Sequence, residues 1–218
     1  MGTLSASYPN SAAVEAALDR ANRAEIDIVA IKERLDALEY KAIAINSFTA
    51  SPNTCELGSS NTITLTWGTN KTPSSQTINN NPVTGNSVQD SGVTSGRTYI
   101  LNVSDGQTSA SKSVDISFVN RIYYGAATDI LTVTSLTSVL SNDPERTINV
   151  NAGAGQYIIY AIPTRLGNVA FFVNGFEGGF EAPQTQTLTN SSGYQETYKV
   201  YRSTNANLGE TTIEVKEG

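Results

Sequence analysis

Histidine is absent from this sequence of 218 residues, and cysteine occurs only once, at Cys55. The lack of histidine removes the commonest transition-metal ligand and the usual general base at neutral pH. A single cysteine cannot form a disulfide within the chain, and the Pro/Asn/Thr-rich stretch around Cys55 offers no basic or histidine partner for a catalytic thiol. We therefore expect Cys55 to be a small packed thiol, and we expect neither a metal site nor a cofactor.

Charged residues are also scarce, at 16% of the chain, and 20 acidic residues stand against 14 basic ones. The formal charge of −6 argues against a nucleic-acid partner, because affinity for phosphates depends on Lys and Arg. No stretch approaches the roughly 20 apolar residues of a membrane helix. The start Met1–Ala6 lacks the basic and apolar segments of a signal peptide. We expect synthesis in a cytoplasm without a secretion signal, and no membrane partner.

What the chain does have is a long helical pattern that follows a polar lead-in. Apolar residues recur at alternating spacings of three and four over residues 12–45. With Val14 at heptad position a, every seam position is apolar. The a residues are Val14, Ala21, Ile28, Leu35 and Ala42, and the d residues are Ala17, Ala24, Ile31, Leu38 and Ile45. A seam sustained over this length predicts an α-helical coiled coil.

Charged residues beside the seam favour a parallel arrangement of the helices. In such an assembly, a residue at g faces the e residue five positions further along the neighbouring chain. The facing pairs, all opposite in sign, are Arg20 with Glu25, Asp27 with Lys32, and Arg34 with Glu39. Each surface pair contributes only about 0.2 to 1 kcal/mol, so the pairs set orientation and register, and burial of the seam supplies the affinity.

The number of helices follows from the residue types in the seam. Ile28 at a beside Ile31 at d favours more than two strands. Residues 34–39 also resemble the Arg-apolar-x-x-apolar-Glu trimerisation motif of parallel coiled coils. We expect a homotrimer. The alternative is a lone amphipathic helix packed on its own β domain, which the off-seam residues Leu18, Ile26 and Val29 would support.

Beyond residue 45 the apolar period changes from helical to alternating. The runs Ile63–Trp67, Tyr99–Val103 and Val114–Phe118 are separated by clusters of turn residues, as in a β-sandwich. The immunoglobulin superfamily supplies a resemblance for two of these segments. Its B strand resembles Glu56–Gly58 followed by Ile63–Trp67, and its F strand resembles Tyr99–Val103. This resemblance implies an immunoglobulin-like or fibronectin-III-like sandwich over residues 46–120.

A second β domain is predicted over residues 121–218, which makes the chain mainly β with an N-terminal coiled coil. A helical turn or two is expected at Ser135–Leu140, before Pro144. The expected strands are Tyr157–Ile162, Val169–Val173, Thr185–Leu188, Tyr194–Tyr201 and Thr211–Val215.

Two acidic pairs in this region could carry chemistry. Glu177 and Glu181, on a hairpin, could approach the spacing of glycosidase carboxylates, although a solvated turn explains them better. Asp143 and Glu145 lack the oxygen-rich spacing of a calcium loop, and a turn is again the better explanation. The sequence therefore predicts no catalytic residues and no enzyme.

Aromatic residues beside Asn and Gln raise the hypothesis of a sugar-binding surface on the second β domain. The candidates are Phe176, Phe180, Tyr194 and Tyr198. The alternative is that these rings belong to the core or to contacts between chains.

The order of these parts resembles that of virion appendage proteins of tailed bacteriophages, such as head fibres and tail or baseplate fibres. The resemblance implies that residues 1–11 attach to another virion protein, that the coiled coil is a stalk, and that the β domains project outward for decoration or for adhesion to a host-surface glycan. The expected location is then the virion, after synthesis in the bacterial cytoplasm. The alternative is a carbohydrate-binding adhesin module that belongs to no virion.

Overall fold

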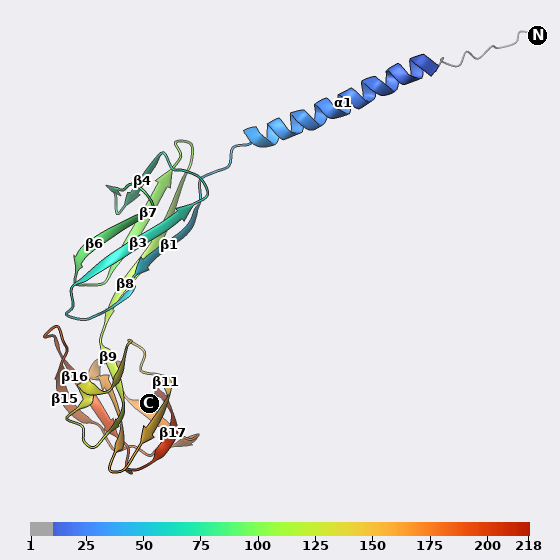
Figure 1. The fold of residues 1–218 in the computed structure, drawn as a ribbon. Coiled ribbons are helices and arrows are strands. Elements are labelled where there is room, and N and C mark those ends of the chain that lie inside the picture. The colour runs from blue at the N-terminus through green and yellow to red at the C-terminus, as the bar shows by residue number, and fades with distance from the viewer. Residues whose placement is uncertain (1–10) are drawn as a thin grey trace, which may run out of the picture. The chain divides into compact units, whose positions relative to one another are not determined.

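The computed structural model describes residues 11–218, except for the side chains of residues 36 and 37. Within this range, one helix, α1 (Ser11–Leu38), is followed by β-structure with two short 3-10 helices (Figure 1). The contacts separate a helical unit ending at Ala42 from a β unit, Ile43–Gly218. The prediction of a mainly β chain with one N-terminal helix is confirmed. Apart from Ser11, the predicted attachment segment lies outside the described residues.

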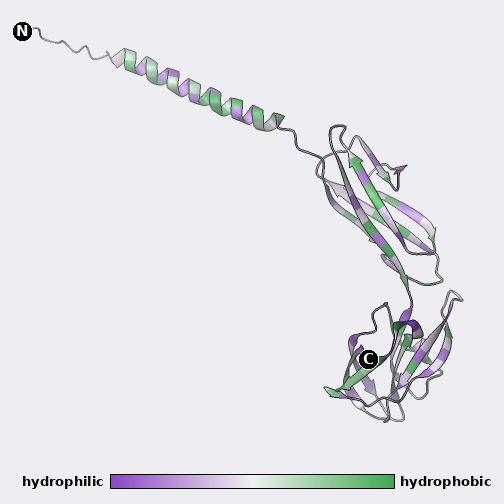
Figure 2. Ribbon diagram, turned by 180° about the vertical axis from the view of Figure 1, so that it is seen from behind, coloured by the Kyte–Doolittle hydropathy of each residue, from purple (hydrophilic) through white to green (hydrophobic). Residues whose placement is uncertain are grey.

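Helix α1 has the composition that a long helix needs. It contains neither Gly nor Pro and is rich in Ala, Leu, Glu and Arg, which have high helix propensities. Green and purple alternate along its whole length in Figure 2, so that apolar residues recur through every part of the helix.

The helix ends at Leu38, so the predicted extent of 12–45 was too long. Ala42 and Ile45, assigned to positions a and d, are not on the helix. The cause lies in the following residues: Ile43 is buried in the core of the first β domain, and its backbone N–H donates to Thr108 Oγ1 at 3.3 Å. Ile45 opens strand β1, so its backbone pairs with another strand.

The first β domain is a sandwich of two sheets. One sheet has the order β1-β3-β6 and the other β2-β8-β7-β4-β5. The strands of the first sheet are β1 (Ile45–Ser51), β3 (Asn61–Thr69) and β6 (Ser87–Val93). Those of the second are β2 (Thr54–Glu56), β8 (Ser109–Val119), β7 (Arg97–Ser104), β4 (Ser75–Ile78) and β5 (Asn81–Pro82).

The core of this domain lies between strands β3 and β7, which belong to opposite sheets. Their inward-facing residues, Leu65 and Trp67 on β3 and Tyr99 and Leu101 on β7, are all buried. The Tyr99 hydroxyl donates to Asp90 Oδ2 at 2.7 Å, a link from the start of β7 back to β6. The expected B and F strands thus occupy the positions that an immunoglobulin-like sandwich assigns to them.

The second β domain is also built from two sheets, with the orders β10-β9-β12-β16-β15 and β11-β17-β13-β14. The strands of the first sheet are β9 (Arg121–Ala127), β10 (Thr137–Leu140), β12 (Tyr157–Pro163), β15 (Gln184–Thr189) and β16 (Gln195–Arg202). Those of the second are β11 (Arg146–Ala152), β13 (Val169–Val173), β14 (Phe176–Glu177) and β17 (Gly209–Glu217).

Strand β12 is buried on both faces, which explains its nearly continuous apolar sequence. Ile158, Tyr160 and Ile162 face the core between the two sheets. Ile159 and Ala161 face a second cluster of buried residues, the outer apolar cluster, on the other side of the sheet.

The segment Ser135–Leu140 differs from its prediction as a helical turn. Only its first residue, Ser135, is helical, as the last residue of the 3-10 helix Val133–Ser135, and Thr137–Leu140 forms strand β10, which pairs with β9. Val133 is buried in the outer apolar cluster. Pairing with β9 satisfies the backbone of this segment, a long-range effect that its short apolar pattern does not encode.

A single residue, Asn120, separates β8 of the first domain from β9 of the second. Its side chain is buried, and its Nδ2 donates to Glu196 Oε2 at 2.9 Å. Next to it, Arg121 Nε lies 3.1 Å from Glu56 Oε1. Polar contacts between residues of the two β domains therefore surround the chain where it passes from one to the other.

The alternation of buried and exposed residues on β7 generates the first prediction. Leu101→Ala should lower the free energy of unfolding by about 2 to 5 kcal/mol, because Leu101 is 0% exposed and truncation leaves a cavity. Ile100→Ala is the matched control, since Ile100 is 42% exposed. Fluorescence of Trp67, the single Trp of the chain and part of the same core, reports the transition in denaturant. Equal losses for both variants would contradict this register.

Candidate functional site

The most extensive apolar surface without cover lies on helix α1. All its described side chains from Ser11 to Leu35, and that of Leu38, are exposed. The large seam residues are among them: Val14, Ile28, Ile31, Leu35 and Leu38. Soluble proteins rarely leave so many large aliphatic side chains in water along one element unless another surface covers them.

The predicted seam changes character along the helix. Its N-terminal half carries Ala17, Ala21 and Ala24, whose side chains add little apolar area. From Ile28 onward the seam has large residues at consecutive a and d positions. Since apolar burial contributes about 25 cal/mol per Å², the C-terminal half can supply most of any association energy.

The charged side chains beside the seam are also not engaged in ion pairs within the described residues. Among the described residues, no ion pair includes any of the six residues of the predicted e–g pairs. Arg20 Nε instead donates to the carbonyl of Ala16, at 3.2 Å. One of the six, Glu39, lies just beyond the helix end.

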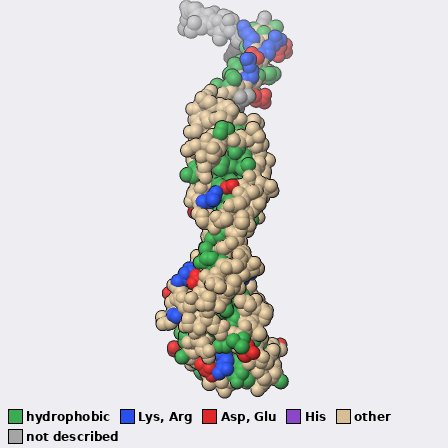
Figure 3. Space-filling model, turned by 90° about the vertical axis from the view of Figure 1, so that its left-hand side faces the viewer, with side chains coloured by type: hydrophobic (Ala, Val, Ile, Leu, Met, Phe, Trp, Pro, Cys, Tyr) green, Lys and Arg blue, Asp and Glu red, His purple; other side chains and the backbone are tan. Residues whose placement is uncertain are grey.

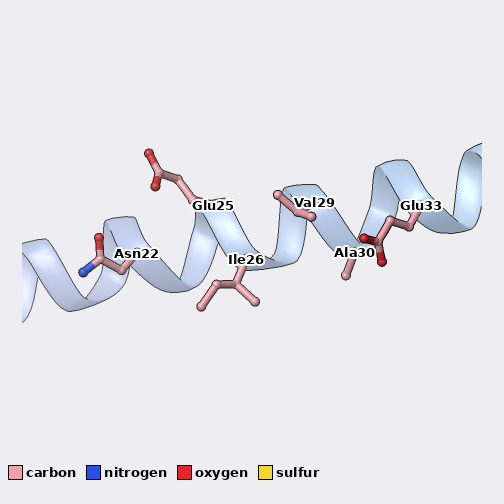
Figure 4. Close-up of a pocket in the computed structure, with 6 residues that line it drawn as sticks. All are labelled: Asn22, Glu25, Ile26, Val29, Ala30 and Glu33. Atoms are coloured by element: carbon pink, nitrogen blue, oxygen red, sulfur yellow. The ribbon is translucent and has the colours of Figure 1, made fainter.

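A second apolar patch lies off the seam and widens the apolar part of the helix. The patch consists of Ile26, Val29 and Ala30, with Glu25 and Glu33 beside it. Figure 4 shows Ile26 and Ala30 on the same side of the helix. The helix thus has two candidate apolar faces, which only substitution can distinguish.

The four aromatic residues of the predicted sugar-binding surface do not share one environment. Tyr198 is a core residue, 4% exposed, whose ring lies 5.7 Å from that of Tyr123 and whose hydroxyl donates to the carbonyl of Arg121 at 2.9 Å. Burial raises the pKa of the Tyr198 hydroxyl. Its inclusion in a ligand surface was wrong, because β16 turns this side chain into the outer apolar cluster.

The other three rings lie on different parts of the chain. Phe176 on β14 is 81% exposed, whereas Phe180 stacks on the buried Phe171 with ring centroids 3.9 Å apart. Tyr194 precedes β16 and packs against Gly58 of the first β domain so closely that a Cβ added at Gly58 would lie 2.3 Å from Tyr194 Cβ. A joint aromatic surface is therefore not formed by these residues.

Two of the four acidic candidates, Glu181 and Asp143, accept hydrogen bonds from other residues of the chain. Glu181 accepts from Arg202 Nη2 at 2.9 Å through both carboxylate oxygens, whereas Glu177 is exposed on β14. Asp143 Oδ1 accepts from the backbone N–H of Glu145 at 2.9 Å, as in a turn. The Asp143 contact is that of a turn, whereas Glu181 is held by Arg202 rather than in a solvated turn.

The remaining predictions about chemistry concern Cys55 and bound ions. Cys55 is 2% exposed in the core of the first β domain. Burial raises the pKa of its thiol and so disfavours the reactive thiolate form. Within residues 11–218 as described, no cluster of three or more His, Cys, Asp or Glu could hold a metal ion. No helix in the same range has the length and apolar character of a membrane span.

Sequence reasoning missed a polar groove of about 510 Å³ on the second β domain. Its exposed polar side chains come from β11 (Asn149 and Asn151), from β17 (Glu210 and Thr212) and from the turn after β13 (Asn174). The groove lies on the outer face of its sheet, because the intervening residues of β11 and β17 point into the core. The alternating sequence of residues 146–152 carries the signal of strand β11, but not its pairing with β17.

Most of the molecular face in Figure 3 is formed by the backbone and by side chains other than the hydrophobic and charged ones. Charged side chains appear there as small separate groups on the β domains. A polar, weakly charged surface of this kind suits ligands that hydrogen-bond without carrying a strong charge.

Comparison with known proteins adds little to this description. No family model and no curated protein matches the chain. Among solved structures, the Titin Ig tandem domains A164-A165 are similar over 81% of this chain and 95% of that one, with 9% sequence identity and a TM-score of 0.26. A likeness at this level carries no argument about function.

The buried tyrosines generate a prediction about alkaline pH. Burial raises the pKa of Tyr160 to about 12, whereas an unfolded tyrosine ionises near pH 10. The unfolded state therefore loses this proton first, and the free energy of unfolding should fall as the pH rises from about 10 to 12. Chemical denaturation at several pH values, followed by circular dichroism, measures the slope. Tyr160→Phe should show a shallower fall, and an identical slope in the variant would contradict the assignment.

Proposed function

We propose that this chain is a non-enzymatic structural protein that forms a parallel homotrimer through helix α1 and displays its two β domains outward. The single observation that carries this proposal is the row of large aliphatic residues at a and d positions that the helix leaves in water. A partner must cover this row, and a second and third copy of the same helix fit it, since the heptad pattern is self-complementary.

The residue types in the seam support three helices. Isoleucine at both a and d, as at Ile28 and Ile31, fits trimer packing better than the Ile-at-a and Leu-at-d pattern of dimers. The helix Ser11–Leu38 contains two of the three predicted e–g pairs, Arg20 with Glu25 and Asp27 with Lys32. In parallel helices these pairs bring opposite charges together, which favours this orientation over the antiparallel one.

We further propose that the trimer is a fibre of a tailed bacteriophage particle, attached through residues preceding the helix. Support comes from the order of the parts: a lead-in, an α-helix with an uncovered apolar seam, an immunoglobulin-like sandwich and a terminal β-sandwich. Appendages of this kind need rigid, repeated display more than they need chemistry. The carbohydrate-binding adhesin remains the second candidate, and the polar groove on the second β domain is the observation that favours it.

The trimer is tested by substitution on the two apolar faces of the helix. Ile31→Asp should convert the chain from a particle of about three times 23.2 kDa into a monomer, because it places a charge in the seam. Ile26→Asp is the control: Ile26 is 68% exposed and Ile31 61%, so the free helix is perturbed to a similar degree by either change. Multi-angle light scattering at micromolar concentration gives the mass. A monomeric wild-type chain would contradict the proposal, and dissociation by Ile26→Asp alone would move the interface to the other face.

The virion location is tested on particles. The full chain should co-purify with phage particles from a producing culture through a density gradient, and mass spectrometry of the particle fraction detects it. A chain without residues 1–10 should keep the trimer mass in solution and be lost from the particles. If the full chain never enters the particle fraction, the virion proposal fails while the trimer proposal stands.

A further inference from the structure

The polar groove on the outer face of β11 and β17 is built like a site for a sugar. We propose that it binds a neutral carbohydrate through the hydroxyl groups of a single residue or disaccharide. Its volume of about 510 Å³ lies within the range of pockets that hold small ligands, roughly 300 to 1,000 Å³. Its lining consists mainly of side-chain amides, a carboxylate and a hydroxyl rather than apolar groups.

Internal hydrogen bonds hold part of the groove in place. Thr212 Oγ1 donates to Asn149 Oδ1 at 2.7 Å, and Asn174 Oδ1 accepts from the backbone N–H of Thr212 at 3.3 Å. The backbone N–H of Asn174 in turn donates to the carbonyl of Thr212 at 2.9 Å. These contacts fix the two amide side chains from opposite sides of β17.

The same contacts leave hydrogen-bonding capacity directed at a ligand. Asn149 and Asn174 each engage their Oδ1, so that their Nδ2 groups remain to donate. Asn151 and Glu210 lie opposite each other in the β11–β17 register and have no side-chain hydrogen bond within the described residues. The groove thus places a hydrogen-bond acceptor, the Glu210 carboxylate, beside amide groups that donate. Neighbouring sugar hydroxyls can bond to both, since each hydroxyl both donates and accepts.

The charges on this face indicate which sugars fit. Glu210 lies in the groove, and Glu214 and Glu177 lie in register on either side of Phe172 on the same sheet. The face also carries Lys216, but its Nζ is held 3.1 Å from Glu214 Oε1. An acidic sugar would meet uncompensated negative charge at the Glu210 carboxylate, so neutral sugars are favoured.

The makeup of the groove leads us to expect weak binding at each single site. The nearby aromatic ring, Phe172, is half-buried and has Lys216 Nζ 4.8 Å from its centroid, so it is not free to stack on a sugar. Binding then depends on hydrogen bonds in exchange with water, which favours weak single-site affinity. Strong attachment would come from several copies acting together, and only this multivalent part rests on the proposed trimer.

The experiment uses the full chain and measures single-site binding, so that a failed trimer does not affect it. Saturation-transfer difference NMR is recorded with methyl glycosides of neutral hexoses and N-acetylhexosamines at up to roughly 10 mM, and with sialic and glucuronic acids as the acidic arm. At least one neutral sugar should receive saturation, and the acidic sugars should receive none. Absence of signal from every neutral sugar, or equal signal from the acidic ones, would overturn the proposal.

Variants place the binding in the groove. Glu210→Gln should weaken binding about tenfold or more, because a hydrogen bond to a charged group is lost. Combined Asn149→Ala and Asn151→Ala should weaken it to a similar degree. Glu214→Gln is the matched control, since it removes the same charge from the same face of the same strand but outside the groove.

Thermal unfolding of each variant shows whether the fold is intact, and a variant that has lost its native transition is replaced by Asn151→Ser alone. If binding survives both Glu210→Gln and the combined asparagine substitutions, or falls equally in Glu214→Gln, the sugar binds elsewhere and the proposed site is wrong.

Discussion

Burial of the aliphatic row on helix α1 is the interaction on which the proposed organisation depends. The helix is long, free of Gly and Pro, and amphipathic, yet all of its described side chains lie in water. Most helical stability in proteins comes from packing of an apolar face rather than from propensity alone. In the proposed trimer, further copies of the same helix would cover this face, as a heptad pattern allows.

The β unit, in contrast to the helix, buries most of its large apolar residues in its own cores. In the first sandwich, Trp67 and Tyr99 close the core from opposite sheets, and in the second, β12 is covered on both faces. The passage between the two domains is short and lined by polar contacts such as Arg121 with Glu56. The β unit buries its own apolar residues, whereas the helix leaves its apolar residues exposed, and this difference agrees with the proposal that the helix serves association and the β domains serve display.

The surface of the second domain suggests what such a display could offer. The aromatic residues predicted to form a sugar-binding surface are dispersed, with Tyr198 in the core and Phe180 stacked on Phe171. The polar face of β11 and β17 instead brings amides and a carboxylate together from strands far apart in the sequence. Recognition there would rest on hydrogen bonds with little apolar contact, and such binding gains most from repetition.

Local periodicity was enough to predict the N-terminal helix and several strands, including the central pair β3 and β7, because side-chain spacing follows directly from backbone geometry. It could not determine that the helix stops at Leu38, where burial of Ile43 and strand β1 take over, or that Thr137–Leu140 pairs as a strand. It also could not separate the buried Tyr198 from the exposed Phe176, or assemble the groove. Those outcomes depend on which distant strands become neighbours and in what register, and this is decided only when the sheets form and pack.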